Sequence, residues 1–123
     1  MLVEIKDVRQ YDNEGFRRWF TDNYFDLIVW YNDNDDNGIS GFQLCYDKEE
    51  SERSLTWIKD RGFSHNKIDA GDHPGRAKMS PILVPDGIFD KNSIAERFKI
   101  ESKKIEPEIS AFIYTKLLMY PAI

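Results

Sequence analysis

The pattern of hydrophobic and polar positions is strand-like in the first half of the chain. Apolar and polar residues alternate over residues 16–21, 39–46 and 53–58. Alternation predicts strands, because successive side chains of a strand point to opposite faces of a sheet. Residues 26–31 are rich in β-branched and aromatic side chains and too few for a helix. Short polar loops separate these segments, so they predict an antiparallel meander of about four strands.

The sheet is predicted to occupy residues 16–70, after an extended arm over residues 1–15. Residues 63–68 have the composition of one more short strand, which makes about four to five strands. Glycine and proline recur across residues 71–90 at positions that forbid a long helix. That stretch is therefore predicted to be irregular.

Residues 91–120 have the spacing of two helices. Apolar residues recur there at three- and four-residue intervals, and Pro107 suits a first helical position, where its missing amide hydrogen costs nothing. Ser93 and Glu96 have the spacing of a capping box at the start of the earlier helix. We expect the two helices to pack on one face of the sheet, which predicts a single α+β domain over residues 1–123.

The faces of the sheet follow from the alternation. The residues predicted to face the helices are Phe42, Leu44, Tyr46, Leu55 and Trp57. Gln43, Cys45 and Thr56 then lie on the opposite face. Residues 27–31 are apolar at every position, whereas a strand with one wet face alternates. This strand is therefore predicted to be central, with its second face covered by residues 62–85, by the N-terminal arm or by a second copy in a homodimer.

Composition and charge exclude several classes of protein. The 123 residues include 41% hydrophobic and 14% aromatic residues, which is more apolar surface than a disordered chain carries. The net charge of −5 shows no basic excess, so we expect no nucleic-acid partner. A signal peptide and an apolar run of about 20 residues are both absent, which predicts a cytoplasmic protein away from membranes. The single cysteine, Cys45, cannot form an internal disulfide.

Four stretches of the chain together resemble a group of short, uncharacterised bacterial proteins of similar length. These stretches are residues 17–20, 26–30, 41–47 and 53–57. The resemblance implies a bacterial, stand-alone, cytoplasmic domain. It implies no activity, ligand or site residue, so the chemistry has to come from the residues themselves.

One candidate site is a cluster of imidazole and carboxylate groups, His65, Asp69, Asp72 and His73. Both histidines of the chain fall within this short segment. Imidazole and carboxylate groups suit a divalent metal such as zinc, manganese or iron. The spacing matches no closed metal motif, so the alternative is an exposed polar loop or histidines bonded to the backbone.

The other candidate is a set of aromatic and polar residues, Arg17, Trp19, Trp30, Gln43 and Trp57. If they share one face of the sheet, they form an aromatic platform with polar groups for a protein or small-molecule partner. The alternative is that the tryptophans belong to the core or to a dimer interface.

Two function classes follow from these candidates. The first is a small binding or interaction module without catalytic activity, for which we assign no catalytic residue and no cofactor. The second is a metal-dependent hydrolase that uses the His/Asp cluster and a divalent metal. The first is favoured, because the chain contains no complete set of nucleophile, base and oxyanion donors.

Overall fold

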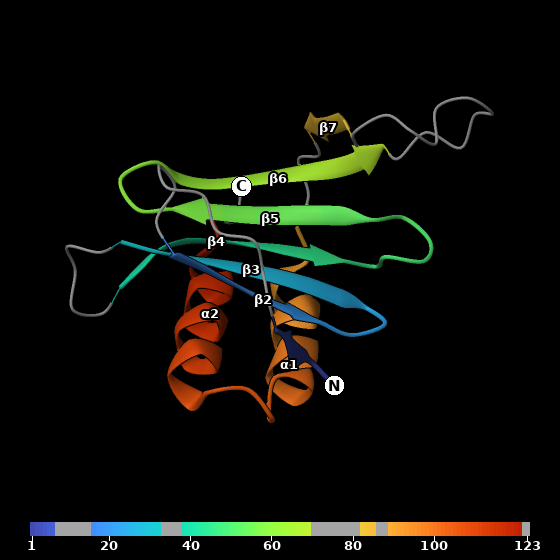
Figure 1. The fold of residues 1–123 in the computed structure, drawn as a ribbon. Helices are drawn as coiled ribbons and strands as arrows, with labels where there is room; N and C mark the ends of the chain where they lie inside the picture. The colour runs from blue at the N-terminus through green and yellow to red at the C-terminus, as the bar shows by residue number, and fades with distance from the viewer. Residues whose placement is uncertain (7–15, 33–37, 70–81, 86–88, 122–123) are drawn as a thin grey trace.

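The computed structural model describes residues 1–6, 16–32, 38–69, 82–85 and 89–121. These residues form a sheet of seven strands in one layer and two helices in a second (Figure 1). The elements are β1 (Val3–Ile5), β2 (Phe16–Thr21), β3 (Phe25–Tyr31), β4 (Ile39–Tyr46), β5 (Arg53–Ile58), β6 (Gly62–Asp69), β7 (Ile82–Pro85), α1 (Lys91–Glu101) and α2 (Pro107–Met119). The predicted α+β class, with an antiparallel sheet and two C-terminal helices, is confirmed.

The strands follow one another across the sheet in chain order, each antiparallel to its neighbour. The predicted number of strands is too low, because both ends of the meander continue further. Val3–Ile5, from the expected arm, pairs with β2, and Ile82–Pro85, from the expected irregular segment, pairs with β6. Runs of three or four residues are too short to show an alternating pattern, and a proline is tolerated in an edge strand such as β7.

The face predicted to meet the helices does so. Leu27, Leu44 and Leu55 stand side by side on β3, β4 and β5 and are fully buried. On the same face the ring of Trp57 lies edge-on to Phe112 of α2, with centroids 5.5 Å apart. Burial of this apolar row against the helices supplies the main driving force for folding.

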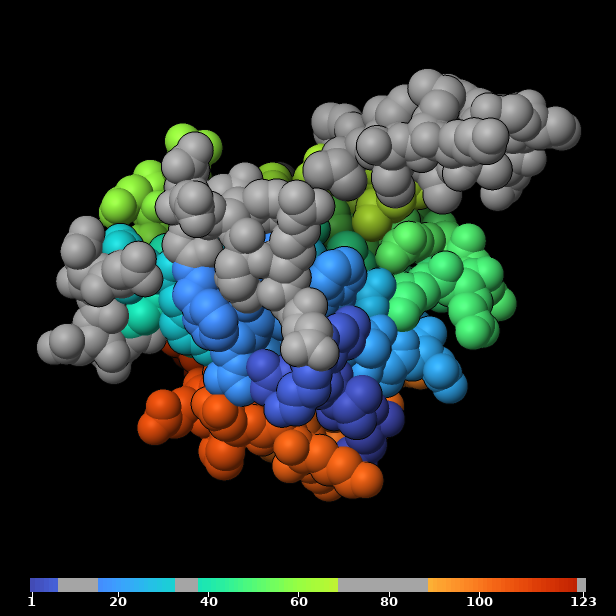
Figure 2. Space-filling model, viewed as in Figure 1, coloured from blue at the N-terminus to red at the C-terminus, as the bar shows by residue number. Residues whose placement is uncertain are grey.

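The N-terminal residues close one edge of this core. The amide of Leu2 donates to the carbonyl of Glu101 at 2.8 Å, and the Leu2 side chain is fully buried. In the space-filling view these residues, drawn in blue, lie against the orange surface of the helices (Figure 2). The start of the chain is thus tied to the end of α1.

The opposite face of the sheet carries a half-buried row across its middle. Trp19, Ile28, Gln43 and Thr56 are neighbours in this row. The prediction that residues 62–85 cover this face is wrong for residues 62–69. These residues extend the sheet as β6 and do not lie over it. Most of the arm and residues 70–81 fall outside the described residues, and a second copy of the chain stays a prediction.

The helix boundaries correct one prediction and confirm another. α1 is capped by Asp90, whose side chain accepts a hydrogen bond from the Ser93 amide at 3.3 Å, so the Ser93–Glu96 capping box is wrong. The helix begins one turn earlier than the predicted capping box requires, so Ser93 lies inside its first turn. Pro107 occupies the first turn of α2, as predicted. Over the described residues, neither helix has the length and apolarity that a bilayer crossing requires.

Candidate functional site

His65 of the predicted metal cluster lies in the core. Its side chain is 6% exposed, on the helix-facing side of β6. Its Nε2 is 2.6 Å from the hydroxyl of Tyr46, and the two rings are stacked with centroids 5.9 Å apart. Phe89 packs against the imidazole from another side, at 5.2 Å. His65 therefore has a structural role between the sheet and the helices.

Asp69 is the one other member of the cluster whose backbone the structure describes, and it lies apart from His65 along the strand. Asp69 ends the same strand four residues later, which places the two Cα atoms about 13 Å apart in extended chain. Asp72 and His73 lie outside the described residues. Where the chain is described, no three His, Cys, Asp or Glu side chains gather in a way that could hold a metal ion.

The predicted aromatic platform is present in part. Arg17, Trp19, Trp30 and Gln43 share the face of the sheet that points away from the helices. Trp57 is on the face that meets the helices, where Phe42 is its neighbour on the adjacent strand. The prediction that Trp57 belongs to the platform is therefore wrong. Strand parity alone could have excluded Trp57. That the other four residues bind a ligand stays a prediction.

Cys45 lies on the same face as the platform, half-buried. Burial raises the pKa of its thiol to about 12, and the nearby carboxylates of Glu52 and Asp26 add to the rise. The thiolate is the reactive form of cysteine. The thiol therefore stays protonated at neutral pH and is a poor nucleophile.

A large hollow lies between α2 and the ends of β2, β3 and β4, and we call it the α2 groove. It measures about 1000 Å³. The residues that line it are Phe16, Arg18, Tyr31, Asn32, Gly38, Ile39, Glu106, Glu108, Ile109, Ala111, Phe112, Thr115, Lys116 and Met119. Ligand sites typically combine such an apolar lining with a few polar groups, and the volume is at the upper end of the usual range.

Apolar side chains are unusually accessible in the α2 groove. Phe16 is 50% exposed and Met119 56% exposed, although both are large and hydrophobic. The ring of Phe16 packs on Tyr31 with centroids 5.8 Å apart, which holds it in place beside the groove. Burying these groups under an apolar ligand would be favourable by about 25 cal/mol per Å².

One end of the α2 groove is fixed by Arg18. Its guanidinium donates two hydrogen bonds to the Glu4 carboxylate, at 2.6 and 2.9 Å, and pairs with Glu106 at 3.0 Å. Hydrogen bonds with Glu4 and then Glu106 raise the pKa of Arg18. Burial raises the pKa of the Tyr31 hydroxyl, against a lowering contribution from Arg18. Arg18 is therefore already neutralised by the protein's own carboxylates.

The other end of the α2 groove presents a cation. The Lys116 ammonium lies 4.3 Å from the ring centroid of Trp57 and 5.6 Å from that of Phe112. It has no carboxylate partner among the residues that the structure describes. The aromatic rings orient the ammonium without neutralising it. Lys116 is thus available to an acidic group of a ligand.

Sequence reasoning did not single out Phe16, Lys116 or Met119. Phe112 and Lys116 are four residues apart and so lie on one helix face, which was visible in the sequence. That this face lies beside the ends of β2–β4 depends on how α2 crosses the sheet, and the sequence pattern carries no signal for it.

The Glu4–Arg18 pair predicts an acid-sensitive contribution to stability. Hydrogen bonding from Arg18 holds the pKa of Glu4 below its ordinary value of 4.5. A lowered folded-state pKa stabilises the fold above the ordinary value, and this contribution is lost as the pH falls through the folded pKa. We expect Glu4→Gln to lower the free energy of unfolding by about 1 kcal/mol or less at pH 7, since the pair is partly exposed. Denaturant melts at pH 7 and at a pH well below the folded-state pKa of Glu4 test this, and a cost that persists at the lower pH would contradict it.

Comparison of the chain with known protein families, with curated proteins and with solved structures gives no match.

Proposed function

We propose that the protein is a binding module without catalytic activity, and that the α2 groove holds an elongated apolar ligand that ends in a carboxylate. One observation carries the proposal. The groove joins accessible apolar surface at Phe16 and Met119 to the Lys116 ammonium, which has no carboxylate partner among the described residues. An apolar ligand with one acidic end would satisfy both features.

The charges along α2 give the ligand a direction. Glu108 lies in the first turn of α2 and Lys116 in the last. Eight residues of helix separate them by about 12 Å. A carboxylate at the Glu108 end would be repelled, whereas at the Lys116 end it would form a charge-assisted hydrogen bond. The ligand's acidic group is therefore assigned to Lys116 and its apolar body to Phe16 and Tyr31.

The state of the reactive side chains supports a binding role over a hydrolytic one. His65 is bonded to Tyr46 in the core, away from both Asp69 and the groove. The Cys45 thiol is protonated by burial. The platform residues Trp19 and Trp30 are half-buried and are not among those that line the α2 groove.

Titration calorimetry with decanoate tests the proposal. We expect saturable binding at one site per chain, and decan-1-ol should bind more weakly because it lacks the charge. Lys116→Met should weaken decanoate binding by about tenfold or more, as expected for a lost hydrogen bond to a charged group. The affinity for decan-1-ol should hardly change.

The matched control is Lys99→Met. Lys99 also lies over an aromatic ring, that of Tyr114 at 5.5 Å, but it does not line the α2 groove. Its replacement should leave decanoate affinity unchanged. The proposal fails if decanoate gives no saturable heat, or if the two lysine variants lose affinity equally.

A further inference from the structure

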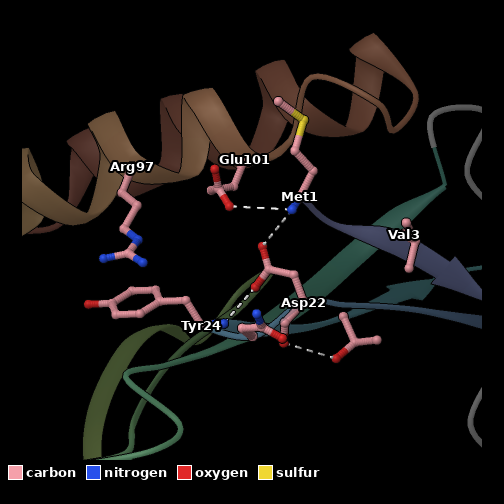
Figure 3. Close-up of a pocket in the computed structure, with 8 residues that line it drawn as sticks. Met1, Val3, Asp22, Tyr24, Arg97 and Glu101 are labelled. Carbon is pink, nitrogen blue, oxygen red and sulfur yellow. Dashed lines mark hydrogen bonds and ion pairs between the residues drawn. The ribbon is translucent and has the colours of Figure 1, made fainter.

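A second hollow lies beside the start of β1, and we call it the polar pocket. It measures about 490 Å³ and opens between the β2–β3 turn and the last turns of α1. Its lining residues are Met1, Val3, Thr21, Asp22, Asn23, Tyr24, Arg97 and Glu101. Figure 3 shows Arg97 and Glu101 projecting from α1 toward Tyr24 and Asp22.

Asp22 offers an unused acceptor in the polar pocket. Its Oδ1 accepts hydrogen bonds from the amides of Tyr24 and Phe25, at 2.8 and 2.6 Å, which fixes the turn. Its Oδ2 is buried without a hydrogen-bond partner, and the side chain is only 6% exposed. The Met1 ammonium lies 3.8 Å from Oδ2, which is beyond hydrogen-bond length. A buried carboxylate oxygen in this state favours a ligand that brings a donor.

Glu101 places a second carboxylate on the same side of the pocket. Its Oε2 lies 3.5 Å from the Met1 ammonium, and dashed lines in Figure 3 join that ammonium to both acids. A carboxylate has lone pairs for several donors, so one ammonium does not saturate two carboxylates. This side of the pocket keeps capacity for a further cationic or N–H group.

Arg97 offers unused donors across the pocket. Its guanidinium lies over the ring of Tyr24, 3.5 Å from the centroid (Figure 3). Within the described residues it makes no hydrogen bond or ion pair. Stacking fixes the plane of a guanidinium while its N–H edges stay open to an anion. The arrangement is that of a positioned anion site.

We infer that the polar pocket binds a free α-amino acid, with the ligand's ammonium at Asp22 and Glu101 and its carboxylate at Arg97. Among the described residues, the Asp22 Oδ2 accepts no hydrogen bond and the Arg97 guanidinium donates none. A zwitterion satisfies both groups together, whereas a simple amine or a simple acid satisfies one of them. The pocket volume lies within the range of small-ligand sites. The inference does not depend on the groove, because the two hollows share no lining residue.

The experiment uses the full chain and each proteinogenic L-amino acid at millimolar concentration, screened by thermal shift and measured by calorimetry. At least one amino acid should bind at one site per chain. Its decarboxylated amine and its deaminated acid should each bind about tenfold more weakly or worse. No binding by any amino acid would overturn the inference, and so would equal binding by either analogue.

Two variants locate the site. Asp22→Asn keeps an Oδ1 acceptor for the turn and removes the negative charge. Arg97→Gln changes an exposed helix position, so this variant stays folded and decides the question even if the first one is unstable. Both should weaken binding by about tenfold or more. Arg61→Gln, at the exposed β5–β6 turn, is the control and should bind normally. Normal binding by Arg97→Gln, or an equal loss in Arg61→Gln, would overturn the assignment.

Discussion

Replacing Phe98 with alanine is expected to lower the free energy of unfolding by about 3–5 kcal/mol. Phe98 is fully buried on the sheet-facing side of α1. Its ring lies edge-on to the fully buried Phe25 of β3, with centroids 5.9 Å apart and an interplanar angle of 80°. Truncation removes this contact and leaves a cavity between the two layers, which the surrounding side chains cannot fill.

Ile100→Ala is the matched control for Phe98→Ala. Ile100 lies two residues further along α1 and is 50% exposed, so its loss should change stability by about 0.5 kcal/mol or less. Urea denaturation of both variants measures the difference. Equal destabilisation would contradict the assignment of the buried face of α1.

Replacing Trp57 with alanine is expected to lower the free energy of unfolding by about 3 kcal/mol, the second large effect. This value is at the lower end of the range for a large aromatic residue, because Trp57 is only half-buried. Its ring stacks on Phe42 at 6.1 Å and meets Phe112 at 5.5 Å, so it joins β4 and β5 to α2. It also supports the Lys116 ammonium. The variant should therefore lose decanoate affinity as well as stability.

Cys45→Ser is the comparison for Trp57→Ala from the opposite face of the sheet. The change removes little volume, and we expect it to lower the free energy of unfolding by about 1 kcal/mol. Denaturant melts of the two variants decide the point. If Trp57→Ala melts like the parent, Trp57 does not join the helices to the sheet and the assignment of faces is wrong.

The sequence predicted the central part of the fold well. The predicted strands at residues 16–21, 39–46 and 53–58 coincide with β2, β4 and β5. Each is long enough to show alternation and is bounded by polar turns. β1 and β7 were missed, because their pairing depends on the neighbouring strand more than on their own few residues.

The candidate sites were harder to predict than the fold. His65 was assigned to a metal cluster, although its alternation with Phe63 in a strand indicates the core-facing side. The groove could not be predicted, because Phe16 and Lys116 are a hundred residues apart in number and meet only through the crossing of α2 over the strand ends. Local patterns identify the face of an element, whereas a groove depends on the placement of two elements.

The most direct test of the groove uses the fluorescence of Trp57 as the only tryptophan, in a Trp19→Phe, Trp30→Phe variant. The Lys116 ammonium lies 4.3 Å from the Trp57 ring centroid, so a ligand carboxylate that binds Lys116 must change the charge beside the indole. Titration with decanoate should shift the Trp57 emission saturably, at the concentrations that produce heat in calorimetry, and Lys116→Met should abolish the shift. Heat of binding with unchanged Trp57 emission would place the ligand elsewhere and contradict the account.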